Sequence, residues 1–375
     1  MTSRERVLTV LNGGIPDRVP IGGGAPAASD LDETARRTLN GTDPADYFGV
    51  DVRSVSFEAG VQETALAGYL RQLPEEAWLG DVETLLGYAE WGYVPPTSQR
   101  GHQEVNPLGG ARTLEEMKKF VFPDLTAERR YRALEAKVAA LHDRGLAVMG
   151  RPPRLGGVIF EAAWRLRGFD AFFIDLIERP ELAAYLLDRM TFFNRINAGV
   201  LAGAGADVIY LGDDIGEPTR MLIHPDLWRR FIKPRMAQIV ASARSVNPAV
   251  HALYHSDGHI LPIVEDLAEI GITALNPVQP DCMDPTLIRA RTGGKMTLWG
   301  TVGAQTTMFY ASPEAVRREV RERVASVGRN GGLVLAPAYD LEPGAPWENL
   351  DAFFKAVDEY GWYGRPGSKP SPMTG

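Results

Sequence analysis

Short apolar runs recur along the chain between residues 126 and 362, and helix-like stretches separate them. Six such runs have the length and composition of buried strands: 146–150, 207–211, 250–254, 272–275, 296–299 and 333–336. The intervening stretches carry helical signals, such as Ser312 as the N-cap before Pro313 at the first position of a helix expected over 313–327. Strands that alternate with helices in this way are typical of βαβ units and a parallel sheet.

This alternation predicts an α/β fold, namely a (β/α)8 TIM-type barrel with an N-terminal elaboration. The N-terminal part is expected to supply the two remaining strands, with candidates over 52–57 and 88–93. An open doubly wound sheet is the alternative, but no Gly-x-Gly-x-x-Gly follows any of the runs. We expect one barrel domain over 1–375, with the elaboration over 1–125, regular units over 126–362 and a loose tail over 363–375.

Charge and cysteine usage limit the partners and the compartment. The net charge of −8, without a basic stripe, argues against nucleic acid or an anionic membrane surface as the main partner. No stretch reaches the 18 apolar residues of a membrane span, and the N-terminus lacks the apolar segment of a signal peptide. Cys282 is the only cysteine, which excludes an intramolecular disulfide. We therefore expect a cytoplasmic protein with a small-molecule substrate; the sequence does not distinguish a monomer from a homodimer.

Acids, amides and an imidazole follow the predicted strands at the point where each strand ends. Loops after parallel strands line the mouth of a barrel, where barrel enzymes place their chemistry. His255 and Asp257 flank one residue in such a loop, so both can face one pocket. An aspartate after a strand also often caps the next helix, and this interpretation stays open for Asp214 and Asp284. The predicted catalytic residues are His255, Asp257, Asp213 and Tyr339, and the predicted substrate-binding residues are Glu217, Asn276, Gln279, Arg151 and Tyr310.

The order of these segments resembles the uroporphyrinogen decarboxylase superfamily, which includes the decarboxylases of haem synthesis and the cobalamin-dependent methyltransferases. The resemblance spans nearly the whole chain and implies the same barrel fold. It is carried by Arg4-Glu5-Arg6-Val7, Pro16-Asp17-Arg18-Val19-Pro20, residues 207–216 and 255–258, Asn276-Pro277-Val278-Gln279, Trp299-Gly300, Ala336-Pro337, Pro346-Trp347-Glu348-Asn349 and Glu359-Tyr360-Gly361.

Within that superfamily the chain is more similar to the methyltransferases. The haem-pathway enzymes carry an Arg-Gln-Ala-Gly-Arg segment whose arginines hold substrate carboxylates, and residues 20–26 of this chain contain no arginine. Thiol-activating methyltransferases bind zinc through a His-x-Cys pair and a later cysteine. The matching positions here are His255, Asp257 and the neighbourhood of Tyr339, so both thiolates are absent, and Cys282 lies in a different loop.

The resemblance therefore implies a methyltransferase that moves a methyl group between a small methylated compound and a separate corrinoid protein or a thiol acceptor. Zinc tolerates carboxylate ligands, so the resemblance implies a site made of His255, Asp257 and Glu217, with Asp213 as an alternative. A fused corrinoid domain would show Asp-x-His-x-x-Gly, but the stretch from Asp257 has Pro262 in place of the glycine. The corrinoid is therefore expected on a partner protein.

Two other classes of function remain open. One is a decarboxylase in which Asp213 or Asp257, kept protonated by burial, supplies a proton to a carbanion-like centre. The other is a barrel that only binds a ligand. The density of ionisable groups after the strands argues against the second class, because idle buried charges are unfavourable.

Overall fold

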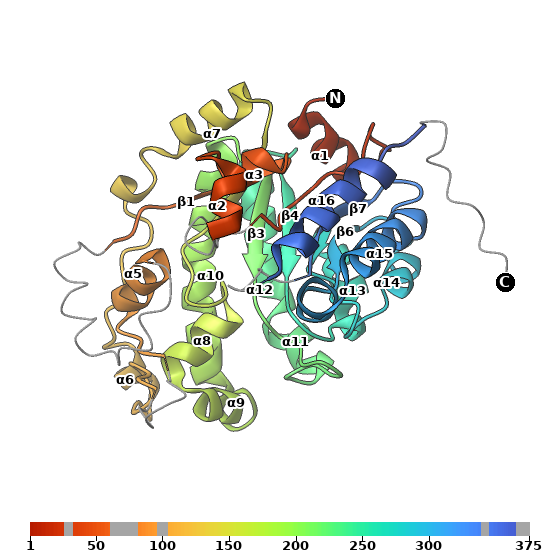
Figure 1. The fold of residues 1–375 in the computed structure, drawn as a ribbon. Coiled ribbons are helices and arrows are strands. Elements are labelled where there is room, and N and C mark those ends of the chain that lie inside the picture. The colour runs from red at the N-terminus through yellow and green to blue at the C-terminus, as the bar shows by residue number, and fades with distance from the viewer. Residues whose placement is uncertain (26–32, 61–81, 96–103, 339–344, 365–375) are drawn as a thin grey trace.

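Seven parallel strands form one sheet in sequential order, and helices alternate with them along the chain (Figure 1). The computed structural model describes residues 1–25, 33–60, 82–95, 104–338 and 345–364. The strands are β1 (Val52–Ser56), β2 (Ala147–Arg151), β3 (Val208–Gly212), β4 (His251–His255), β5 (Ala274–Asn276), β6 (Thr297–Val302) and β7 (Leu333–Pro337). All six runs predicted after residue 126 are therefore strands, and the run at 52–57 is β1.

Residues 20–22 occupy the place of an eighth strand between β7 and β1. Ile21 forms a parallel bridge with Leu335, and the Leu335 N–H donates to the Pro20 carbonyl oxygen over 2.8 Å. On the other side the Asp51 N–H, directly before β1, donates to the Ile21 carbonyl oxygen over 2.9 Å. The sheet therefore closes on itself, and the predicted TIM-type barrel is confirmed, with two strand positions supplied by the N-terminal part.

The helices of the N-terminal part are α1 (Ser3–Leu11), α2 (Glu33–Leu39), α3 (Pro44–Tyr47), α5 (Val82–Trp91) and α6 (Leu114–Met117). Those that alternate with the strands are α7 (Leu134–Asp143), α8 (Phe160–Arg167), α9 (Phe169–Glu178), α10 (Pro180–Gly203), α11 (Pro225–Phe231), α12 (Lys233–Val246), α13 (Val264–Glu269), α14 (Pro285–Arg291), α15 (Pro313–Ala325) and α16 (Trp347–Tyr360), with short η3 (Glu128–Arg130), η4 (Leu261–Ile263) and η5 (Ala304–Met308) turns. Among the residues described, no helix combines the length and apolar character needed to cross a bilayer.

The prediction of a strand over 88–93 is wrong, because residues 88–91 belong to α5. Aromatic residues favour strands, but those in this segment pack around the end of a helix instead. The Tyr88 and Tyr93 rings meet edge to face, with their centroids 5.4 Å apart. Gly92, at φ 66°, ends the helix, as glycines in the left-handed region commonly do. Helix α9 directly follows α8, and residues 225–246 form two helices, α11 and α12, which are separated at Ile232.

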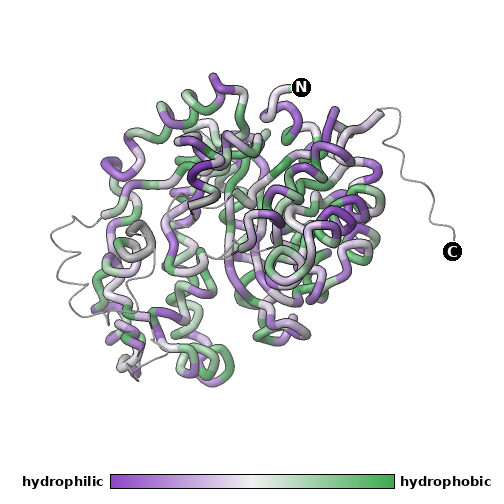
Figure 2. The backbone as a smooth tube through the Cα atoms, in the orientation of Figure 1, coloured by the Kyte–Doolittle hydropathy of each residue, from purple (hydrophilic) through white to green (hydrophobic). Residues whose placement is uncertain are grey.

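Two apolar layers pack on the two faces of the sheet. The outer layer joins the strands to the surrounding helices, which alternate between hydrophilic and hydrophobic positions along their length (Figure 2). The inner layer fills the barrel and includes Trp299, which is 2% exposed, as predicted for a strand residue. Val7, Val10 and Leu11 of α1 belong to the inner layer. Helix α1 therefore plugs the N-terminal end of the barrel, which leaves the opposite end for chemistry.

A buried ion-pair network holds this plug in place. The Asp51 carboxylate is fully buried and accepts hydrogen bonds from Arg6 Nη1 over 2.7 Å and from Arg18 Nη2 over 3.0 Å. The Ile21 N–H donates to the same carboxylate over 2.7 Å, and Arg6 also pairs with Asp17. The Arg4-Glu5-Arg6-Val7 and Pro16-Asp17-Arg18 segments are thus structural, and they lie at the end of the barrel away from the mouth.

Candidate active site

Polar side chains meet at the C-terminal edge of the sheet because neighbouring strands end there in register. His255 is the last residue of β4, Asn276 is the last residue of β5, and the two are paired across the sheet. Gly212, which ends β3, pairs with His255 on its other side. The loops after β3, β4 and β5 therefore begin side by side at the barrel mouth, where TIM barrels place catalytic residues.

Asn276 fixes both the orientation and the tautomer of the His255 imidazole. Asn276 Nδ2 donates to the Trp299 carbonyl oxygen over 3.1 Å, so Asn276 Oδ1 faces His255 as an acceptor. His255 Nδ1 lies 2.5 Å from that oxygen and must therefore carry the proton that it donates. The other ring nitrogen, Nε2, is left to interact with the mouth of the barrel.

Two carboxylates face His255 Nε2. Asp214 Oδ1 lies 3.6 Å from Nε2 and Asp257 Oδ1 lies 4.0 Å from it. One ligand atom from each of these three residues lies within 4.8 Å of the other two. We call Asp214, His255 and Asp257 the rim cluster. Their side chains are 39%, 22% and 24% exposed, so solvent and small molecules reach them.

The rim cluster fits a divalent cation by its donor chemistry. A neutral imidazole nitrogen and two carboxylate oxygens are an ordinary ligand set for zinc. Without a proton or a cation between them, two carboxylates and a nitrogen lone pair repel one another, so the arrangement favours a positive charge at its centre. The bond from His255 to Asn276 supplies the outer hydrogen bond that metal-ligating histidines usually make.

The loops after β3 and β4 are tied together by backbone contacts, which bring Asp214 to Asp257. The Asp257 N–H donates to Asp214 Oδ1 over 2.9 Å, and the His259 N–H donates to the Glu217 carbonyl oxygen over 2.7 Å. Gly216 and Gly258 make the approach possible, because a Cβ on either one would lie within 2.6 Å of the opposite backbone. Asp214 is therefore not the cap of a following helix, whereas Asp284 does cap α14 through the Thr286 N–H.

Gln279 and two strained backbone positions shape the neighbouring loops. Gln279 Oε1 accepts a hydrogen bond from the Gly258 N–H over 2.6 Å, so it positions the loop that carries Asp257. Val278 (φ 51°) and Thr301 (φ 74°) adopt the left-handed region, which is unfavourable for β-branched residues. The Thr301 N–H donates to the Pro277 carbonyl oxygen over 3.0 Å and joins the loops after β5 and β6. Such strain is often concentrated at functional sites.

Asp213 lies behind the rim cluster and not in the mouth. Its carboxylate is fully buried and accepts hydrogen bonds from the N–H groups of Ile159, Phe160 and Glu161, at the start of α8. Burial, followed by the nearby Glu161 carboxylate, raises the pKa of Asp213 to about 8, while the three N–H donors act in the opposite direction. The expectation that Asp213 contacts substrate does not match this position, because the side chain caps a helix.

Glu161 is a residue of this region that the sequence analysis missed. Its carboxylate is largely buried, accepts a hydrogen bond from the Asp214 N–H over 3.1 Å and pairs with Arg165 at 3.2 Å. Burial, followed by the charge of Asp214, raises the pKa of Glu161. Glu161 lies in the first turn of α8, where an acidic residue by itself indicates only a favourable interaction with the helix dipole.

Other predicted site residues have different surroundings. Glu217 pairs with Arg220 at 2.7 Å and is not in the rim cluster, so the carboxylate that joins His255 and Asp257 is Asp214 instead. Tyr310 is 85% exposed, with its ring beside that of Phe309. Arg151 ends β2 and donates from Nε to Ser54 Oγ over 3.1 Å. Tyr339 lies outside the described residues, as does the tail beyond residue 364.

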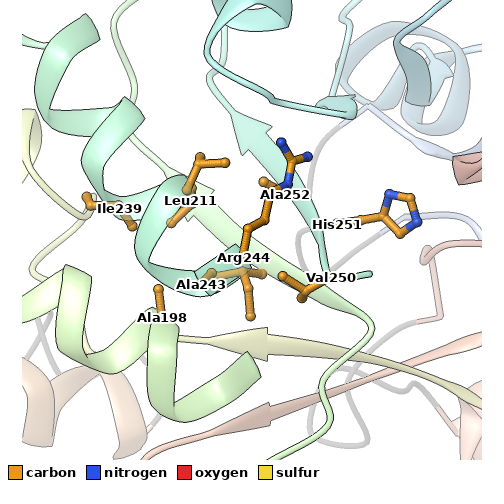
Figure 3. Close-up of a pocket in the computed structure, with 10 residues that line it drawn as sticks. Ala198, Leu211, Ile239, Ala243, Arg244, Val250, His251 and Ala252 are labelled. Atoms are coloured by element: carbon orange, nitrogen blue, oxygen red, sulfur yellow. The ribbon is translucent and has the colours of Figure 1, made fainter. Parts of the chain in front are cut away.

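A small pocket lies between the sheet and the helices (Figure 3). It is lined mainly by apolar side chains of α10, α12, β3 and β4, among them Ala198, Leu211 and Ile239. Its cationic group, Arg244, donates to the Gly271 carbonyl oxygen over 2.7 Å. Most of the lining residues belong to the outer apolar layer, so we interpret this pocket as a gap in the packing between the sheet and the helices.

Known proteins are similar to this chain over much of its length. A methylcobamide:CoM methyltransferase MtaA of Methanosarcina barkeri is 30% identical over 185 residues, which cover 49% of this chain and 51% of that protein. A uroporphyrinogen decarboxylase of Hydrogenovibrio crunogenus is 26% identical over 270 residues, covering 66% of this chain and 69% of that protein. The chain thus spans about half the length of the first of these relatives.

The solved structure of a methyltransferase from Methanosarcina mazei superposes with a TM-score of 0.61 at 20% identity, covering 96% of this chain and 99% of that one, which supports the fold. The family model described as uroporphyrinogen decarboxylase (URO-D) matches residues 155–360. That match includes β3 to β7 and the whole rim cluster, and it covers more than half of the chain. The chain belongs to the uroporphyrinogen decarboxylase (URO-D) family.

Proposed function

We propose that the protein is a methyltransferase that moves a methyl group between a small methylated compound and a corrinoid carried by a separate protein. The observation that carries the proposal is the rim cluster, in which His255 Nε2 faces the carboxylates of Asp214 and Asp257 at the barrel mouth. Similarity to a protein named methylcobamide:CoM methyltransferase supports the same class of reaction.

In this reaction the bond between the methyl carbon and an oxygen, nitrogen or sulfur atom of the donor breaks. The methyl group passes to the reduced corrinoid, which is the nucleophile, and the electron pair of the broken bond stays on the leaving atom. The barrel must therefore stabilise negative charge on that atom. A proton on His255 Nε2 would do this directly, and the proton would end on the leaving atom.

A divalent cation held by Asp214, His255 and Asp257 would supply Lewis-acid stabilisation of the same leaving atom. Asn276 keeps the proton of the His255 ring on Nδ1, so that Nε2 stays aimed at the cluster. Gln279 holds the backbone at Gly258 and thereby the loop that carries Asp257. The ligand set contains no thiolate, which donates more electron density than carboxylate, so a bound ion would remain a harder acid.

The test combines metal analysis with methyl transfer. Purified protein would be analysed for zinc and other divalent metals, and then incubated with methylated donors and chemically reduced cobalamin, with methylation of the cobalamin followed by visible absorbance. We expect about one metal ion per chain and transfer from at least one donor, with both lost in His255→Ala combined with Asp257→Ala. Activity that is unaffected by this double substitution would instead indicate that the rim cluster takes no part in the chemistry.

A decarboxylase is the second candidate function. Several relatives are named uroporphyrinogen decarboxylase, and Asp257, whose side chain is 24% exposed at the mouth, is the candidate acid for this reaction, since Asp213 is fully buried behind the rim cluster. This alternative predicts release of carbon dioxide by metal-free protein and loss of that release in Asp257→Asn. It would replace the methyltransferase proposal if methyl transfer is absent for every donor.

A further inference from the structure

Two arginines lie against one aromatic ring beside the rim cluster. The guanidinium carbon of Arg151 lies 4.3 Å from the centroid of the Tyr210 ring, and that of Arg154 lies 5.3 Å from the same centroid. Arg151 ends β2, and the pairing of Gly150 with Ile209 places it next to Tyr210 of β3. Two cationic groups are thus gathered on the inner wall near the mouth.

Tyr210 joins these arginines to the rim cluster. Its ring centroid lies 5.5 Å from that of His255, with the two ring planes tilted by 34°. Along the mouth, the arginines are therefore followed by a tyrosine ring, then by His255, and then by the carboxylates of Asp214 and Asp257. The mouth has a cationic side and an acidic side, with an aromatic surface between them.

A stacked arginine keeps its ability to bind an anion. Stacking uses the face of the guanidinium group, whereas its N–H donors lie in the plane and form a fork that matches a carboxylate. Arg151 is also oriented by its bond from Nε to Ser54 Oγ at 3.1 Å. Hydrogen bonds between a guanidinium and a carboxylate are charge-assisted and about twice as strong as neutral ones.

We propose that Arg151 and Arg154 bind a carboxylate group of the substrate, so that the substrate class is a methylated carboxylic acid. The identity of the reacting end rests on the proposed methyltransferase function. The guanidinium forks of the two arginines give the anionic end of the substrate a favourable position on their side of the mouth. The ring of Tyr210 then supports the apolar part of the substrate, and the methylated atom lies at the rim cluster.

The test compares acids with amides of the same shape. Isothermal titration calorimetry at pH 7.5 would measure three pairs: methoxyacetate and methoxyacetamide, 3-(methylthio)propionate and its amide, and 4-methoxybenzoate and its amide. We expect at least one acid to bind about tenfold or more tightly than its amide. This preference should fall below about threefold in Arg151→Gln and vanish in the Arg151→Gln, Arg154→Gln double variant.

The matched control is Arg317→Gln, which removes an arginine that stacks on Tyr360 in the outer helical layer, 5.8 Å from the ring centroid. This variant should retain the full preference. The inference is overturned if no acid is preferred over its amide in the unaltered protein, including the case in which nothing binds. It is also overturned if the preference persists in the double variant, because the arginines would then only balance the charge of the nearby acids.

A second variant separates this inference from the proposed function. Asp214→Asn should lose metal and methyl transfer but should still prefer acids, since it leaves both arginines in place. An acid preference without any methyl transfer would preserve the carboxylate site and reject the methyltransferase. Methyl transfer from acids and amides with equal efficiency would support the methyltransferase and reject the carboxylate site.

Discussion

Asn276 Oδ1 lies 2.5 Å from His255 Nδ1, and this one contact decides which nitrogen of the imidazole faces the mouth of the barrel. Asn276 cannot turn its amide around without losing the hydrogen bond to the Trp299 carbonyl oxygen. The chemistry proposed for Nε2 therefore depends on a residue in the neighbouring strand that itself need not touch the substrate.

Substitution of Asn276 by alanine should weaken metal binding without removing any ligand. Outer hydrogen-bond partners of ligating histidines typically change metal affinity by about 10- to 100-fold, and we expect a loss in that range. The measurement is a competition titration with a chromogenic zinc chelator. Asn247→Ala, in an exposed turn after α12, is the control and should leave the affinity unchanged. Equal affinity in Asn276→Ala and the unaltered protein would mean that His255 is not a ligand.

Asp214 and Glu217 are a matched pair of carboxylates for testing which residue is the third metal ligand beside His255 and Asp257. Both carboxylates lie in the loop after β3 and both side chains are 39% exposed, but only Asp214 approaches His255. Asp214→Asn should abolish stoichiometric zinc binding, whereas Glu217→Gln should retain it. Elemental analysis of both purified variants checks this. The reverse result would support the ligand set that the sequence alone suggested.

Gly258 is expected to be sensitive to the addition of a single methyl group. It has φ 76°, and a Cβ would lie 2.6 Å from the Glu217 carbonyl oxygen, which cannot move without separating the two loops. Gly258→Ala should lower the free energy of unfolding by about 2 kcal/mol or more, with loss of metal binding. Gly293→Ala is the control for backbone strain alone, since it has φ 59° and open space around it. If the two substitutions lower the free energy of unfolding by about the same amount, the close approach of the two loops is unimportant for stability.

The sequence predicted the parts of the site that depend on strand order and missed those that depend on the path of the loops. His255, Asp257 and Asn276 could be placed because each lies at or just after a strand end, and the strands deliver them to one edge. The choice between Asp214 and Glu217 depends on contacts between two loops, such as the one from the His259 N–H to the Glu217 carbonyl oxygen. No local pattern encodes those contacts.

Adjacent aspartates illustrate the same limit. Asp213 and Asp214 look equivalent in the sequence, but one side chain enters the interior and the other faces the mouth. The start of α8 decides which of the two side chains points inward. The Ile159 and Phe160 N–H groups donate to the Asp213 carboxylate, although they lie about fifty residues earlier in the chain. Glu161 was missed for the same reason.

Asp213 also makes the stability of the protein depend on pH. Its pKa is raised from 3.8 to about 8 by burial and by Glu161, so the folded state holds this proton over a range in which the unfolded chain has released it. A raised acid pKa stabilises the fold at low pH, and this contribution is lost as pH rises from about 4 to about 8, with a slope of up to about 1.4 kcal/mol per pH unit. Denaturant unfolding of metal-free protein at pH 5, 6, 7 and 8 would measure the slope. Asp213→Asn carries no titrating group there, so its slope should be shallower, even though the amide fits the three N–H donors less well and lowers stability at every pH. Parallel curves for the two proteins would mean that those donors keep Asp213 ionised throughout, so that its burial does not make the stability of the fold depend on pH.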